Sequence, residues 1–211
     1  MIRKMLLLLL AGTLLLAVLP AWAKGPAEPI TISVLEAAQM LASEPKGTFM
    51  VDVRTRAEYA LLGHPPRAYN VPWRLSTNDF QVKGGPYDGG KTQFTGYQLS
   101  AKPNPDFLGV MGSLFKQGDK LLIISASGEQ GAQAAEALSK AGYTQVYNLA
   151  HGFLGSPLAP EKQAELAQKY SPIYRSRGRL NGWLFWGLPV SHDLDPRYIY
   201  PPDLKRMQKQ K

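Results

Sequence analysis

A six-residue loop carries the groups best placed to bind a small anion or to act as a nucleophile. It joins the apolar run "KLLII" to the alanine-rich run "GAQAAEAL", and its residues are Ser125, Ala126, Ser127, Gly128, Glu129 and Gln130. A strand, a tight loop and a helix in this order place the loop amides at a helix N-terminus, where the dipole and unpaired N–H groups favour anions. Serine is a weak nucleophile without an activating base, and no triad partner stands near Ser125 in the sequence. Two interpretations stay open: the loop binds an anion, or Ser125 and Ser127 only cap the helix and satisfy the loop amides.

Residue counts exclude several chemistries. The 211 residues include no cysteine, so the chain has no thiolate nucleophile, no thiolate metal ligand and no disulfide. The three histidines are His64, His151 and His192, and no pair has a metal-ligand spacing such as i, i+4. We therefore predict neither a metal site nor another cofactor.

The N-terminus has the three parts of a secretory signal peptide. Arg3 and Lys4 precede an apolar run over residues 5–19, and Ala21-Trp22-Ala23 matches a small-x-small cleavage site. We expect cleavage after residue 23 and a secreted, periplasmic protein. The alternative is an uncleaved membrane anchor, although the apolar run is shorter than the roughly 20 residues that a span requires.

The net charge favours acidic partners. Loss of Arg3 and Lys4 with the signal peptide lowers the formal charge from +8 to +6, which favours contact with anionic surfaces. Residues 203–211, "DLKRMQKQK", form a basic tail that either touches anionic lipid or is simply solvated. Export and the lack of a basic-aromatic motif argue against nucleic acid as a partner.

Hydrophobic patterning predicts an α/β fold with a mainly parallel central sheet. Ser33 and Glu36 form a capping box that opens a helix through Leu41, with Val34, Leu35, Ala38 and Leu41 available for the core. Further strands are expected at residues 48–53, 68–71, 120–124 and 145–149, and further helices at 56–61, 107–115 and 131–141, the last ended by Gly142. In such sheets ligands lie beyond the carboxyl ends of the strands, where the Ser125 loop begins.

Two segments stand outside this alternation. Residues 24–31 are expected to form an N-terminal tether, and residues 74–106 a Gly/Pro-rich surface excursion with a hairpin at Asp88-Gly89. Tyr87, Phe94 and Tyr97 in the excursion suit either contact with a partner or shielding of a sheet edge.

Three motifs in order resemble those of a known family. "FMVDVRTRAEYALLGHPPRAYNVPW" ends a strand in Asp52-Val53-Arg54 and continues through His64. The second motif is "LLIISASGEQGAQAAEALSKAGYTQVYNLAHGF". The third motif, which contains Trp183, is "NGWLFWGLPV". Together they resemble rhodanese-like domains over residues 32–190. The resemblance implies the three-layer fold of that family, with an insertion at 154–180. Residues 191–211 follow the matched domain as a basic C-terminal tail, of which residues 203–211 are the final part.

The resemblance also implies a changed site. In that family a cysteine ends the central strand and carries sulfur as a persulfide within the loop amides, and arginines flank it. Here Ser125 matches the cysteine, and Ala126 and Gln130 match the arginines. A hydroxyl forms no persulfide, so we expect no sulfur transfer and no catalytic residue.

Roles for the other matched residues also follow from the resemblance. Asp52 and Arg54 would pair at the strand end, and His64 would bond a turn. His151 stands where the family has glycine, and it either overhangs the pocket or has no task. The expected role is that of a binding or adaptor module for an envelope protein. The alternatives are a module that handles a small sulfur oxyanion or a sulfur carrier together with a partner thiol, and a scaffold that acts through the excursion and the tail.

Overall fold

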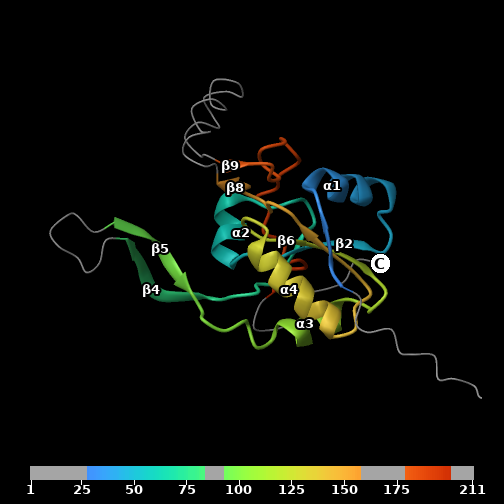
Figure 1. Ribbon diagram of the computed structural model, residues 1–211, viewed down its shortest axis with the longest axis horizontal. Coiled ribbons are helices and arrows are strands. Elements are labelled where there is room, and N and C mark those ends of the chain that lie inside the picture. Colours follow the sequence, from blue (N-terminus) through green and yellow to red (C-terminus); the bar gives the residue numbers. More distant parts are fainter. Residues whose placement is uncertain (1–27, 84–92, 158–178, 201–211) are drawn as a thin grey trace, which may run out of the picture.

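A five-stranded parallel sheet forms the centre of the protein in the computed structural model, which describes residues 28–83, 93–157 and 179–200 (Figure 1). The strand order is β1-β7-β6-β2-β3, and every neighbouring pair in it is parallel. The sheet strands are β1 (Ile30–Ile32), β2 (Thr48–Asp52), β3 (Tyr69–Asn70), β6 (Lys120–Ile124) and β7 (Gln145–Leu149). The predicted α/β class is confirmed.

Helices cover both faces of the sheet and make three layers. Leu122 and Ile124 of β6 pack with α1 and α2, whereas Leu121 and Ile123 pack with α3 and α4. This alternation follows from the period of two along a strand, and it explains why the central strand is apolar throughout. The helices are α1 (Val34–Ser43), α2 (Arg56–Leu62), α3 (Phe107–Leu114) and α4 (Glu129–Lys140).

The ends of the elements differ from the sequence predictions in a few places. Ser33 and Glu36 form the expected capping box, and α1 continues two residues past Leu41. Leu35 is not a core residue: it is 44% exposed, and Ala37 fills the core position instead. The last two residues of the expected tether lie in β1, because Ile30–Ile32 pairs with β7. Short edge strands of this kind carry little pattern in the sequence.

The excursion is an antiparallel hairpin that projects from the body of the protein (Figure 1). Its strands are β4 (Ser76–Lys83) and β5 (Gln93–Leu99). The turn expected at Asp88-Gly89, together with Tyr87, lies outside the described residues, and the roles of Phe94 and Tyr97 remain predictions. Within the expected insertion, β8 (Ser156–Pro157) and β9 (Arg179–Leu180) pair with each other.

Residues 191–200, which we call the C-terminal strap, pack along the β3 edge of the sheet. Ser191 and His64 exchange two backbone hydrogen bonds of 2.8 and 3.0 Å. Farther along, Asn70 of β3 donates to the Tyr198 carbonyl oxygen and accepts from the Tyr200 amide. Tyr198 and Tyr200 are buried in the core beneath this edge. The first half of the segment expected as a basic tail is therefore part of the fold.

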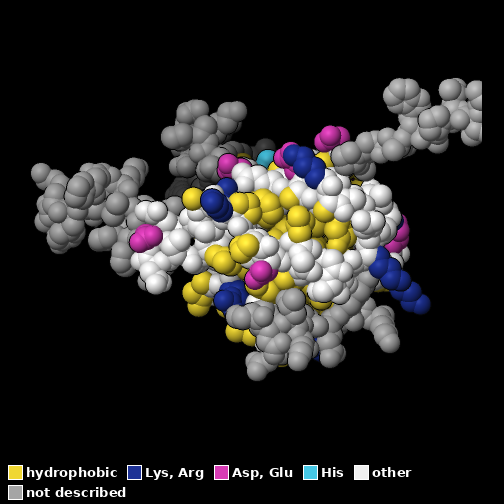
Figure 2. Space-filling view, turned by 90° about the horizontal axis from the view of Figure 1, so that it is seen from below, with side chains coloured by type: hydrophobic (Ala, Val, Ile, Leu, Met, Phe, Trp, Pro, Cys, Tyr) yellow, Lys and Arg dark blue, Asp and Glu magenta, His cyan; other side chains and the backbone are white. Residues whose placement is uncertain are grey.

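The exposed surface carries some apolar side chains. Figure 2 shows the face seen from below Figure 1, with hydrophobic side chains gathered near its centre and basic side chains around them. Leu108 of α3 is 45% exposed.

No helix within the described ranges is long and apolar enough to cross a membrane. The expected signal peptide (1–23), the basic residues Arg175 and Arg177 and the tail at 203–211 lie outside those ranges.

Candidate functional site

The loop from Ser125 to Gln130 leaves the carboxyl end of the central strand and enters α4. Gly128 adopts φ +95°, a left-handed conformation that favours glycine, and α4 begins at the next residue. Ser125 is 1% exposed, and its Oγ accepts a hydrogen bond of 3.0 Å from the Gly128 amide. The hydroxyl therefore uses one loop amide internally. Among the described residues, the Ser127 hydroxyl makes no such bond to the start of α4.

Backbone amides of the segment that follows β7 hold the loop in place. The Phe153 amide donates to the Ser125 carbonyl oxygen at 2.7 Å, and the Leu154 amide donates to that of Ala126 at 2.9 Å. Gly152, at φ +57°, lies so close that a Cβ there would stand 2.2 Å from the Ser125 carbonyl oxygen. These contacts fix the conformation of the loop through its backbone rather than through its side chains.

A second close contact lies next to the Ser125 hydroxyl. A Cβ at Gly131, in the first turn of α4, would stand 2.4 Å from Asn148 Oδ1 and 3.3 Å from Ser125 Oγ. Asn148 Oδ1 is buried and has no hydrogen-bond partner within the described residues. A glycine and a neutral amide thus lie next to the hydroxyl, and among the described residues its one hydrogen-bond partner is the Gly128 amide.

The remaining loop amides keep the geometry of a helix N-terminus. Within the described chain no acceptor is recorded for the amides of Ala126, Ser127, Glu129, Gln130 and Gly131. Glu129 is exposed in the first turn of α4, where its carboxylate interacts favourably with the helix dipole and competes with any anion. The loop offers backbone donors and no cationic side chain.

Asp52 and Arg54 form a buried ion pair beside this loop. Arg54 Nε and Nη2 donate to the two carboxylate oxygens at 2.5–3.1 Å, and Nη2 also donates to the Gly63 carbonyl oxygen at 2.8 Å. The guanidinium carbon lies 3.9 Å from the centre of the Phe153 ring. The pair connects the end of β2, the end of α2 and the segment under the loop.

A family model described as the rhodanese-like domain matches residues 33–155, more than half of the chain. The chain belongs to this family. The resemblance drawn from its motifs is confirmed, and Ser125 directly follows the central strand β6 of this rhodanese-like domain.

Curated relatives agree with this assignment over part of the chain. Senescence-associated protein DIN1 of Raphanus sativus is 33% identical over 49% of this chain and 45% of its own length. Rhodanese-like domain-containing protein 15 of Arabidopsis thaliana is 31% identical over 49% of this chain and 46% of its own length. The chain thus spans less than half the length of these two relatives. Thiosulfate sulfurtransferase 18 of the same plant is 30% identical over 60% of this chain and 77% of its own length.

A solved structure shares the fold. The crystal structure of Rv0390 from M. tuberculosis superposes with a TM-score of 0.53 at 23% identity, and the match covers 79% of this chain and all of that one. At this identity the likeness shows the fold alone. The family's three layers and parallel sheet are those described above.

His64 and Trp183 of the rhodanese-like domain hold segments that are distant in sequence. His64 is buried and stacks on Tyr59 with ring centres 3.6 Å apart, while its ring nitrogens lie 3.0 and 3.1 Å from the carbonyl oxygens of Pro65 and Asp193. Trp183 donates from its amide to the Gly152 carbonyl oxygen and from Nε1 to that of Pro189. His64 fixes the C-terminal strap, and Trp183 fixes the closing segment to the turn under the loop.

His151 contributes to the turn beneath the loop. Its φ is +64°, and its Nδ1 lies 2.6 Å from Ser156 Oγ at the start of β8. Its carbonyl oxygen accepts from the Gly155 amide. Within the described part of the chain, no group of three His, Asp or Glu side chains could hold a metal ion.

Sequence reasoning missed the residues that shape the site from behind. In the sequence, Asn148 looks like an ordinary residue of the strand β7, and Gly131 like the start of a helix. A polar residue within a buried strand was the one signal available for Asn148, since buried polar groups normally have a partner.

Proposed function

We propose that this chain is an exported rhodanese-like protein that transfers no sulfur by itself and acts as a binding or adaptor module. The observation that carries the proposal is Ser125 at the end of β6, buried and bonded to the Gly128 amide. A persulfide is a sulfur–sulfur bond, and the chain has no cysteine to form one. The proposed partner is a protein of the cell envelope, in keeping with the expected signal peptide.

The contacts of Ser125 support loss of the chemistry with retention of the fold. The hydroxyl accepts the amide hydrogen of Gly128, the residue directly before α4, and the loop backbone is held by Phe153 and Leu154. Hydrogen bonds hold the loop backbone, but the loop lacks the arginines that the family resemblance implies on either side of the cysteine. A fold that is kept without its reactive group is suited to presenting a binding surface to a partner protein.

A second candidate function is favoured by the amides at the start of α4. The amides of Ala126, Ser127, Glu129, Gln130 and Gly131 have no recorded acceptor within the described chain, which suits a small sulfur oxyanion or a sulfur carrier. In this form a partner protein would supply the thiol. The carboxylate of Glu129 weakens the attraction, so the affinity for a free oxyanion would be low.

Sulfur transfer from thiosulfate to cyanide tests both candidates. The purified protein is compared with its Ser125→Cys variant, and thiocyanate is measured. We expect no turnover by the natural protein, and turnover would contradict the proposal. Activity in the variant would show that the loop still accommodates a persulfide and would favour the second candidate. A folded but inactive variant would favour the adaptor.

The proposed export and membrane contact need their own measurements. After expression with the full leader, the N-terminal residue of the mature protein is expected to be Lys24, and a retained Met1 would support the anchor instead. Binding to vesicles with and without anionic lipid, before and after deletion of residues 203–211, tests the basic tail. Equal binding by both forms would remove the tail from consideration.

A further inference from the structure

A hollow of about 370 Å³ opens at the amino end of the sheet, away from the Ser125 loop. It lies where the chain enters β2 and β3, and its walls come from Leu41, residues 45–50, residues 66–67, Tyr69 and, in the C-terminal strap, Tyr198. Because all five strands are parallel, the loop lies at their carboxyl ends and this hollow at the opposite end. Its volume falls within the range of small-molecule sites, roughly 300–1,000 Å³.

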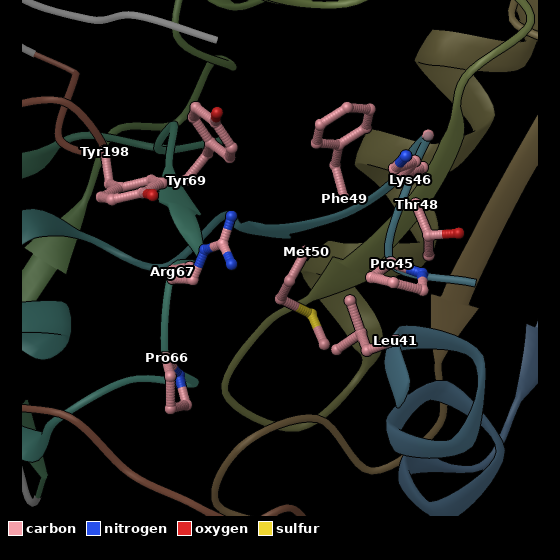
Figure 3. Close-up of a pocket in the computed structure, with 11 residues that line it drawn as sticks. Leu41, Pro45, Lys46, Thr48, Phe49, Met50, Pro66, Arg67, Tyr69 and Tyr198 are labelled. Atoms are coloured by element: carbon pink, nitrogen blue, oxygen red, sulfur yellow. The ribbon is translucent and has the colours of Figure 1, made fainter. Parts of the chain in front are cut away.

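The hollow has two cationic side chains and no acidic one in its walls. Figure 3 shows Arg67 on the same side as Tyr198, with Phe49 and Lys46 across the open space. Arg67 and Lys46 are exposed, and neither has a hydrogen-bond or ion-pair partner within the described residues. Two cations without an acidic neighbour in the same wall favour an anion in this space, while on its other side Arg67 also lines a hollow that contains Asp193 and Asp195.

Arg67 is held in an unusual backbone conformation. Its φ is +62°, one of three positive values among the described residues other than glycine. Such a conformation is strained and persists where the surroundings fix it, often at a binding site. In Figure 3 the guanidinium extends from this turn into the hollow.

Polar groups without partners lie beside these cations. The Tyr198 hydroxyl is buried and has no hydrogen-bond partner among the described residues. Strand β3 pairs only with Val51 and Asp52, so the earlier part of β2 has no strand on that side. Along β2, backbone groups point alternately to the two neighbouring sides. Those of Gly47 and Val53 bond β6 and its end, so the odd-numbered residues face β6. The backbone N–H and C=O of Thr48 therefore point to the opposite side, toward the hollow.

Apolar side chains make up much of the remaining wall. Leu41, Met50 and the rings of Phe49 and Tyr69 line it, together with Pro45 and Pro66. A fully hydrated inorganic anion would leave this surface unused. The walls fit a ligand with a flat or branched apolar body and a single anionic head.

We propose that this hollow is a binding site for a small organic acid, with Arg67 holding the acidic group, Lys46 adding positive charge from the other side and the aromatic wall holding the body. The Tyr198 hydroxyl and the open edge of β2 supply further hydrogen bonds to the acid. The site is separate from the Ser125 loop and does not depend on its chemistry.

Titration of the ¹⁵N-labelled protein with phenylacetate tests the proposal by NMR. We expect shifts of the amide resonances of Gly47, Thr48, Phe49 and Arg67 at millimolar or lower ligand, and unchanged resonances in the Ser125 loop. The neutral isostere phenylacetamide is expected to bind at least about tenfold more weakly, since it cannot form the charge-assisted hydrogen bond of the carboxylate.

Matched variants separate the cation from general effects. Arg67→Ala is expected to weaken phenylacetate about tenfold, whereas Lys116→Ala, which removes an exposed cation elsewhere, leaves the affinity unchanged. Tyr198→Phe tests the hydroxyl without removing the ring. Equal binding of acid and amide, shifts centred on the Ser125 loop, or no shifts with phenylacetate, benzoate and benzenesulfonate at millimolar concentration would overturn the proposal.

Discussion

Gly152 packs against Ser125 backbone to backbone, so that a Cβ at Gly152 would stand 2.2 Å from the Ser125 carbonyl oxygen. The Phe153 amide bonds that same oxygen at 2.7 Å. The conformation of the loop at the end of β6 therefore depends on a glycine that follows it by 27 positions in the sequence.

Gly152→Ala is expected to destabilise the protein by about 2–3 kcal/mol, because the new Cβ meets backbone and φ is +57°. Chemical denaturation measures the change. The control is Gly109→Ala on the exposed side of α3, where a Cβ has open space and alanine is expected to stabilise by up to about 1 kcal/mol. Equal effects at the two positions would contradict the packing described.

Removing one member of the Asp52–Arg54 pair is expected to cost about 3–5 kcal/mol, because the partner is left as an uncompensated buried charge. Asp52→Asn and Arg54→Met test the two directions, and denaturation gives the free energy of unfolding. For comparison, Glu136→Ala breaks an exposed pair with Lys140 and should change stability far less, because solvent screens the two charges. A small effect in the buried pair would mean that water reaches it.

His64→Ala is expected to loosen the C-terminal strap and to cost about 2 kcal/mol, since it removes the stacking on Tyr59 and the bond to the Asp193 carbonyl oxygen. Hydrogen exchange should rise at Asn70 and Tyr200, whose amides bond across the strap edge. His192→Ala, at an exposed position one residue past the bridge, is expected to leave this exchange unchanged. Unaltered protection in the His64 variant would show that the strap is held by Tyr198 and Tyr200 alone.

Alkaline pH is expected to weaken the fold through Tyr59. Burial, chiefly, raises the pKa of its phenol well above the ordinary 10.0, and the negative charge of Asp52 adds to this. The folded state then keeps the proton while the unfolded chain loses it. This contribution is fully present below pH 10 and is lost as the pH rises above 10 toward the folded-state value.

Tyr59→Phe removes the titrating group and the bond from its hydroxyl to the Ala68 carbonyl oxygen. The variant should be less stable than the natural protein at neutral pH by about 1 kcal/mol. Above pH 10 the difference should shrink by up to about 1.4 kcal/mol per pH unit. A constant difference between pH 8 and 11 would show that Tyr59 ionises as freely in the folded protein as in the unfolded chain.

The sequence by itself determined the sheet's central elements and the chemistry that is absent. The run at 120–124 is apolar at every buried position, so its assignment as a central strand required no tertiary information, and the capping box at Ser33 and Glu36 set the start of α1 in the same way. The lack of cysteine excludes a persulfide whatever the fold.

Tertiary structure alone decided the neighbours of Ser125 and the position of the strap. Gly152, Asn148 and Gly131 meet around Ser125 because β7 lies beside β6, a pairing between segments that are separate in sequence. Arg67 faces Tyr198 across more than 100 residues because the strap pairs with β3. Such contacts depend on the packing of whole elements, and no local pattern of hydrophobic or capping residues encodes them.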